Sequence, residues 1–217
     1  DQGVGAAEGL RVGVALRRYF PPRSRLVPNR IAAALGLGSR DEAAMTDRLA
    51  TRVAAALDKL AEEQPVQAIF MPSYDRVHEG DTQLAEMVRA RMTTARGTVL
   101  RLDGPAAYKA VCGTVDLMLA GRMHPAILAA GMGRPVCGLG YNQKFAGFFS
   151  LIGRSDCLID VAALMAADKP DGLVACLGRA REAGPPGAGV IDDLAARVRD
   201  ALRAQLARAG LQRKNGT

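Results

Sequence analysis

Apolar residues along this chain alternate between two patterns. Six stretches are nearly continuous apolar runs, as expected for strands of a parallel sheet that is covered on both faces. These predicted strands span residues 10–16, 66–71, 98–102, 115–120, 135–139 and 157–161. Between them, apolar residues recur every three or four positions, which is the period of a helix with one buried face.

The helical pattern predicts six helices. They span residues 41–63, 80–96, 105–112, 125–131, 145–152 and 191–213. Pro125 suits the first position of its helix, where its missing N–H has no cost. Asp192 and Asp193 fall in the first turn of the last helix and Arg208 near its end, so these charges complement the helix dipole.

Strands that alternate with helices in this way predict an α/β fold. The expected architecture is a doubly wound, mostly parallel sheet of the Rossmann type, in which ligands bind at the carboxyl ends of the strands. We interpret residues 1–217 as a single domain, with a loop or lid at 20–40, a connector at 184–189 and a terminal helix within 190–214.

Composition narrows the class of protein. The 217 residues are 49% hydrophobic, which is enough for a sizeable core. The four cysteines form no Cys-x-x-Cys pair and only two histidines accompany them, so a zinc site is not expected. The cysteines lie in apolar runs, as buried reduced thiols do, and no stretch resembles a signal peptide or a membrane span. We therefore expect a cytoplasmic protein.

The net charge of +7 favours anionic partners. The basic residues are scattered, with no run of five like charges, which disfavours nucleic acid as the partner. Membrane phosphates and a small acidic metabolite both fit the charge.

Arg122 and His124 flank the predicted start of a helix that follows a buried strand. Backbone N–H groups and the dipole favour an anion there, and a guanidinium strengthens such a site. The alternative is structural, with the histidine capping the helix and the arginine in an ion pair.

Other polar residues follow neighbouring strands. Arg17 comes directly after the first apolar run, and Lys144 follows the fifth in a helical first turn where the dipole disfavours a structural cation. Both are candidates for the same crevice. A third cluster contains Asp81, which we expect to cap its helix, and His78, whose role stays open.

The chain resembles the polysaccharide pyruvyl transferase family. The likeness rests on an Arg-hydrophobic-His triplet, an Ala-rich helix, a Gly-x-Pro turn and a Tyr-x-x-Lys segment 20 residues after the histidine. In this sequence they are Arg122-Met123-His124, Ile127 to Ala130, Gly133-Arg134-Pro135 and Tyr141-Asn142-Gln143-Lys144, with Asp116 and Phe148 nearby. Arg17, Met71-Pro72 and Leu102-Asp103-Gly104 also fit, so the likeness covers most of the chain.

The resemblance implies transfer of a pyruvyl group from phosphoenolpyruvate to two hydroxyls of a cell-surface polysaccharide as a cyclic ketal, with release of phosphate. It implies that His124 is the acid/base residue, that Arg17 and Arg122 hold the donor's carboxylate or phosphate, and that Lys144 stabilises phosphate or the acceptor. Met123, Tyr141 and Asn142 complete the implied substrate site. No cofactor or metal is implied.

The implied fold is one Rossmann-like half of a two-domain glycosyltransferase-type structure. Relatives commonly have another such domain first, so we interpret the chain as a donor-binding carboxyl-terminal half, a fragment or a compact relative. Asn142 stands where an aspartate is commoner in the family. Whether the acceptor is lipid-linked, whether the protein contacts the inner face of the membrane and whether copies associate stay open.

Two further classes of function fit the sequence. A nucleotide-sugar-dependent glycosyltransferase domain would also present helix N-termini to a diphosphate. An acidic ribose ligand on a loop after a late strand would favour this class; Asp160 precedes such a loop, and its role stays open. A non-catalytic domain that binds a phosphorylated metabolite would keep its function in His124→Ala.

Overall fold

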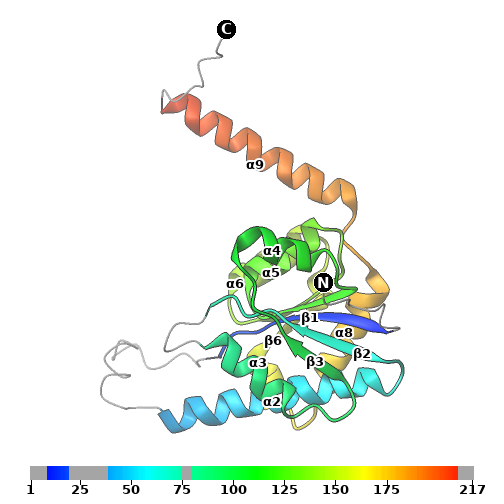
Figure 1. Ribbon diagram of the computed structural model, residues 1–217. Helices are drawn as coiled ribbons and strands as arrows, with labels where there is room; N and C mark the ends of the chain where they lie inside the picture. Colours follow the sequence, from blue (N-terminus) through cyan, green and yellow to red (C-terminus); the bar gives the residue numbers. More distant parts are fainter. Residues whose placement is uncertain (1–8, 20–38, 75–79, 210–217) are drawn as a thin grey trace.

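The computed structural model describes residues 9–19, 39–74 and 80–209. Six parallel strands form one sheet in the order β3-β2-β1-β4-β5-β6 (Figure 1). The strands are β1 (Leu10–Ala15), β2 (Val66–Phe70), β3 (Arg96–Val99), β4 (Leu117–Ala120), β5 (Val136–Gly140) and β6 (Leu158–Asp160). All six predicted strands and the Rossmann-like, doubly wound class are confirmed.

Helices cover both faces of this sheet. They are α2 (Ser39–Ala61), α3 (Asp81–Arg89), α4 (Gly104–Cys112), α5 (Met123–Gly131), α6 (Gln143–Leu151), α7 (Val161–Ala166), α8 (Asp171–Ala183) and α9 (Ala188–Arg208), with a short 3-10 turn η1 (Ser155–Cys157) before β6. Helices α2, α3 and α8 pack on one face, and α4, α5 and α6 pack on the other (Figure 1).

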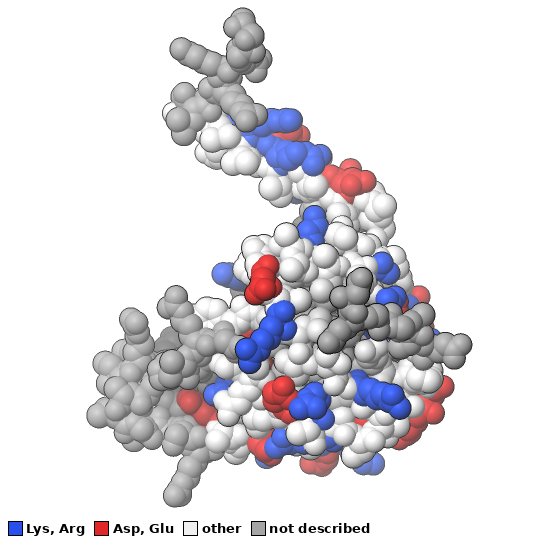
Figure 2. Space-filling model, viewed as in Figure 1, with Lys and Arg blue, Asp and Glu red and all other residues white. Residues whose placement is uncertain are grey.

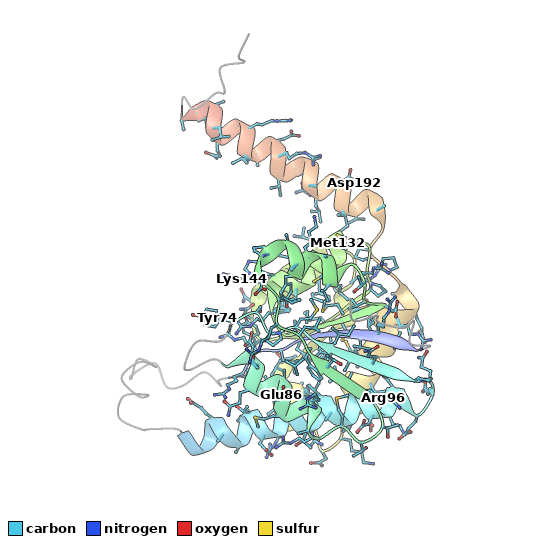
Figure 3. All side chains as sticks on the ribbon, in the orientation of Figure 1. Tyr74, Glu86, Arg96, Met132, Lys144 and Asp192 are labelled. Carbon is cyan, nitrogen blue, oxygen red and sulfur yellow. The ribbon has the colours of Figure 1, made fainter. Side chains whose placement is uncertain are left out.

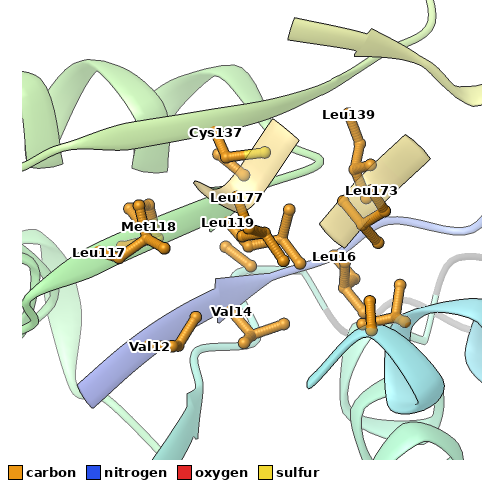
Figure 4. Packing of buried hydrophobic residues seen from close by; sticks show 14 of the residues in the cluster. Val12, Val14, Leu16, Leu117, Met118, Leu119, Cys137, Leu139, Leu173 and Leu177 are labelled. Atoms are coloured by element: carbon orange, nitrogen blue, oxygen red, sulfur yellow. The ribbon is translucent and has the colours of Figure 1, made fainter. Parts of the chain in front are cut away.

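The core lies on the two central strands and their neighbours. Val12 and Val14 of β1 and Leu119 of β4 are buried among leucines of β5 and α8 (Figure 4). On β5, a Cβ at Gly138 would lie 2.6 Å from the ring of Phe149, so only glycine lets that ring close over the strand. Phe149 is fully buried, which makes it a core residue rather than an interface residue.

The chain reverses its winding direction between β1 and β4. These strands pair from Val12 with Leu117 to Ala15 with Ala120. The connection after β1 leads to one side of the sheet and the connection after β4 leads to the other. The carboxyl ends of β1 and β4 therefore open a crevice, which is where doubly wound sheets bind ligands.

The predicted boundaries of two helices were wrong. Helix α3 ends at Arg89 rather than continuing to residue 96, because the Asp58 carboxylate accepts the backbone N–H groups of residues 93–95 and holds them in a turn. Helix α5 begins at Met123, so Pro125 is its third residue. Proline is tolerated there because N–H groups in the first turn have no partner within the helix.

The carboxyl-terminal part also differs from the prediction. Helices α7 and α8 were not predicted, and α9 begins at Ala188, which places Asp192 and Asp193 beyond its first turn. The predicted loop or lid lies outside the described residues except for its last two, which begin α2.

Helix α9 projects away from the rest of the molecule (Figure 1). None of its residues is buried, and Val198 and Leu202 are 66% and 58% exposed.

Basic and acidic side chains are interspersed on the face of the molecule shown in Figure 2. Within the described ranges, no helix is both long and apolar enough to cross a membrane.

Candidate active site

A cavity of about 250 Å³ lies at the carboxyl ends of the central strands. Its lining comes from the segments after β1, from the ends of β4 and β5, and from α2 and α7. The lining residues are Arg17, Arg18, Tyr19, Leu49, Gly121, Leu139, Tyr141 and Val161. The cavity thus occupies the switch point between β1 and β4, with two arginines in an otherwise mainly apolar wall.

Arg17 and Tyr141, which follow β1 and β5, meet in this cavity. A guanidinium N–H of Arg17 donates to the Tyr141 hydroxyl at 2.9 Å, and the guanidinium carbon lies 4.6 Å from the centre of the Tyr141 ring. These contacts fix the orientation of the arginine and tie the end of β1 to the end of β5.

Arg18 also lines the cavity, although sequence reasoning did not single it out. One terminal nitrogen donates to the Gln83 side chain on α3. Its Nε is buried and has no hydrogen-bond partner among the described residues. Together with Arg17, this residue places two guanidinium groups in the cavity wall, and these would stabilise an anion there. The available signal was its position next to Arg17, directly after a buried strand.

Arg122, which follows the cavity residue Gly121, forms a buried ion pair with Asp81. Arg122 Nε and a terminal nitrogen donate to the two Asp81 oxygens at 2.7 and 2.6 Å, and the side chains are 17% and 1% exposed. The predicted capping role of Asp81 was wrong, because Gly80 is the N-cap of α3 and no side chain in the described ranges caps this helix. The Asp81 carboxylate instead accepts the N–H groups of Ser73 and Tyr74 after β2.

His124 is the second residue of α5 and is exposed. Its imidazole does not cap the helix, because Arg122 is the N-cap residue and no described side chain accepts an N–H of the first turn. Met123, the first residue, is half-buried against the core. The histidine therefore stands at an uncapped helix start, three residues after the cavity residue Gly121.

Lys144 occupies the corresponding position on α6, as its second residue, and its side chain is exposed. In Figure 3, Lys144 lies on the same side of the molecule as Tyr74, which follows β2. Asn142 is the N-cap residue, and its side-chain oxygen accepts the N–H groups of Lys144 and Phe145. The commoner aspartate at this position would cap the helix equally well, so the exchange keeps the local structure.

Two other residues from the sequence analysis have structural partners. Asp116 lies at the amino end of β4, where it pairs with Arg11 at 2.8 Å, at the opposite edge of the sheet from the cavity. Asp160, whose role the sequence left open, is the N-cap of α7 and accepts the N–H of Ala163 at 3.0 Å, which gives it a structural role. His78 lies outside the described residues.

The four cysteines are buried and reduced, as the sequence predicts. Burial raises the pKa of both the Cys112 and the Cys157 thiol to about 11, which makes them poor nucleophiles. The sulfur atoms of Cys137 and Cys176 are 3.1 Å apart in the core. In the part of the chain that the structure describes, no group of three or more His, Cys, Asp or Glu side chains is arranged to hold a metal ion.

A family model supports the resemblance seen in the sequence. The model for polysaccharide pyruvyl transferase matches residues 24–143, more than half of the chain. The match includes Arg122, His124 and Tyr141, begins after Arg17 and stops one residue before Lys144. No curated protein matches the chain in sequence. The chain belongs to the polysaccharide pyruvyl transferase family.

Proposed function

We propose that this chain transfers a pyruvyl group from phosphoenolpyruvate to a sugar of a cell-surface polysaccharide, as a cyclic ketal, with release of phosphate. The family supports pyruvyl transfer to a polysaccharide. The observation that carries the choice of donor is the cavity between β1 and β4, which Arg17 and Arg18 line together.

The donor site needs several cations within a short distance, because phosphoenolpyruvate carries a carboxylate and a phosphate on three carbons. We assign its anionic groups to Arg17 and Arg18, together with the N–H groups at the start of α5. Arg122 contributes less charge than the sequence suggests, because the Asp81 carboxylate compensates it. The small cavity suits such a metabolite better than a nucleotide-sugar.

The reaction then requires an acid at the methylene carbon of the donor. We assign this role to His124: its proton is added to that carbon, which leaves an oxocarbenium-like centre at the adjacent carbon. One sugar hydroxyl attacks this centre, the bond to the phosphate oxygen breaks, and the second hydroxyl closes the ketal. Of the two hydroxyl protons, one restores the imidazolium and the other leaves with phosphate.

Lys144 completes the assignment. Its exposed side chain, on the helix next to that of His124, suits the departing phosphate or the incoming acceptor. Met123, Tyr141 and Asn142 shape the site through packing, the contact with Arg17 and the cap of α6. We propose that the reaction takes place in the cytoplasm, without a cofactor.

Calorimetric titration with phosphoenolpyruvate tests the donor assignment. We expect wild-type binding that is weakened about 10- to 100-fold in Arg18→Ala, as the loss of a charge-assisted hydrogen bond implies. Arg89→Ala is the matched control, because it removes the same charge from a surface pair with Glu86. Binding of a nucleotide-sugar instead of phosphoenolpyruvate would overturn the proposal in favour of a glycosyltransferase domain.

A further inference from the structure

We propose that Asp81 is a positioning residue, which fixes Arg122 at the start of α5 and thereby sets the orientation of His124. Its consequence for turnover rests on the function proposed above, in which His124 is the acid. The hydrogen bonds described for Asp81 go to Ser73, Tyr74 and Arg122, so we infer that it acts on His124 through Arg122.

The first step of the argument is the way in which Asp81 is held. Its carboxylate is 1% exposed and receives hydrogen bonds from two different segments. The backbone N–H groups of Ser73 and Tyr74 donate to Oδ2 at 3.2 and 3.0 Å. These hydrogen bonds hold the carboxylate to the segment after β2 independently of Arg122.

The second step is the bidentate interaction of Asp81 with Arg122. The guanidinium meets both carboxylate oxygens in a bidentate arrangement, which restricts orientation as well as distance. It also lies 5.4 Å from the centre of the Tyr74 ring, on the same segment. Asp81 thus links the segment after β2 and the start of α3, which are close in sequence, to the start of α5, which lies 41 residues further along the chain.

The third step leads from Arg122 to His124. Arg122 is the extended N-cap residue of α5, with φ −122° and ψ 141°, and His124 follows two residues later. Since no described side chain caps this helix, its first turn is held by the Arg122 ion pair and by the packing of Met123, Pro125 and Ala126. A change in the ion pair would therefore alter the direction in which the imidazole points.

A purely structural role for the ion pair is the competing hypothesis. Buried ion pairs contribute little net stability compared with apolar residues of similar volume, which leaves their geometry as the reason to retain them. The molecule contains a suitable control in the pair of Arg11 and Asp116, which is also bidentate but lies at the amino ends of β1 and β4.

The test uses the imidazole itself as a reporter. The chain has only two histidines, so His78→Gln assigns the two imidazole NMR signals. In Asp81→Asn we expect the His124 signals to shift and turnover to fall about 10- to 100-fold, without a rise in the KM for phosphoenolpyruvate. Asp116→Asn should leave both the His124 signals and turnover as in wild type.

Coupling to Arg122 is measured with a double variant. Asp81→Asn combined with Arg122→Gln should be no slower than Arg122→Gln alone, because the two residues act as one unit. If Asp81→Asn does not fold, Arg122→Lys provides the test, since it keeps the charge and loses the bidentate contact.

Unchanged His124 signals and turnover in a folded Asp81→Asn, or in Arg122→Lys, would overturn the proposal. A rise in KM without a change in the His124 signals would also overturn it and assign Arg122 to substrate binding. A wild-type chain without turnover whose His124 signals still respond to Asp81→Asn would refute the proposed reaction and support the positioning role.

Discussion

The junctions between β4 and α5 and between β5 and α6 have the same layout but differ in the residue that occupies the N-cap of the helix. Each runs from a buried strand into a nine-residue helix and places a candidate catalytic side chain at its second position. At α6 the Asn142 side chain accepts two N–H groups of the first turn. At α5 the N-cap is Arg122, whose guanidinium can only donate and is held by Asp81.

This difference indicates which helix start can receive an anion. The first turn of α6 already has an acceptor in Asn142, so its dipole is partly satisfied within the chain. The first turn of α5 has no described side-chain acceptor and follows shortly after Gly121, which lines the cavity with Arg17 and Arg18. We therefore expect the donor's anion near α5, and Lys144 to act through its side chain alone.

The largest effect should separate His124 from Lys144. We expect His124→Ala to lower pyruvyl transfer by about 10²- to 10⁴-fold, the usual contribution of a general acid. Lys144→Ala should cost about tenfold, as one exposed charge–phosphate contact implies. Steady-state release of phosphate measures both, and Gln143→Ala is the exposed neighbour that should change nothing. A larger loss in Lys144→Ala than in His124→Ala would reverse the roles of the two junctions.

A smaller effect concerns the cap of α6. Asn142→Ala should lower the free energy of unfolding by about 1 kcal/mol, because two N–H groups of the first turn lose their acceptor. Urea denaturation measures this change, and Asn142→Asp should restore most of the stability. If Asn142→Asp were as unstable as Asn142→Ala, the hydrogen bonds to Lys144 and Phe145 would not be the source of the cap's stability.

The smallest effect lies at the far edge of the sheet. Hydrogen bonds from the Arg11 side chain lower the pKa of Asp116 below its ordinary value of 3.8. A carboxyl whose pKa is lowered by folding stabilises the protein above its ordinary pKa, and this contribution disappears as the pH falls through the folded value. As the pH is lowered from 6 to 3, the temperature at the midpoint of thermal unfolding should therefore fall less steeply in Asp116→Asn than in wild type. Because the pair is partly exposed, the difference should be small, and identical slopes would contradict it.

The strands were predictable because both faces of the sheet are covered. Short continuous apolar runs, such as those of β4 and β5, are typical of parallel strands that are buried on both faces. Helix ends were harder to predict, since tertiary contacts decide them, as Asp58 does after α3. Helix α8 had local signals that were available, with Asp171 in its first turn and Gly184 just beyond its end.

The candidate site was predictable only in part. The meeting of Arg17 and Tyr141 follows from the rule that parallel strands end at one edge of the sheet. The pairing of Arg122 with Asp81 does not, because two residues 41 positions apart each had a plausible local role. The unpartnered Nε of Arg18 is a property of packing and left no trace in the sequence.

The pairing of β1 with β4 has a consequence for folding. Val12 pairs with Leu117, across about half of the chain, whereas β4 and β5 are neighbours in sequence. Contacts between distant residues have a high entropic cost and form slowly. The crevice that contains Arg17 and Arg18 should therefore form late in refolding, after β4 and β5 have paired, so that the ability to bind an anion marks the last stage of folding.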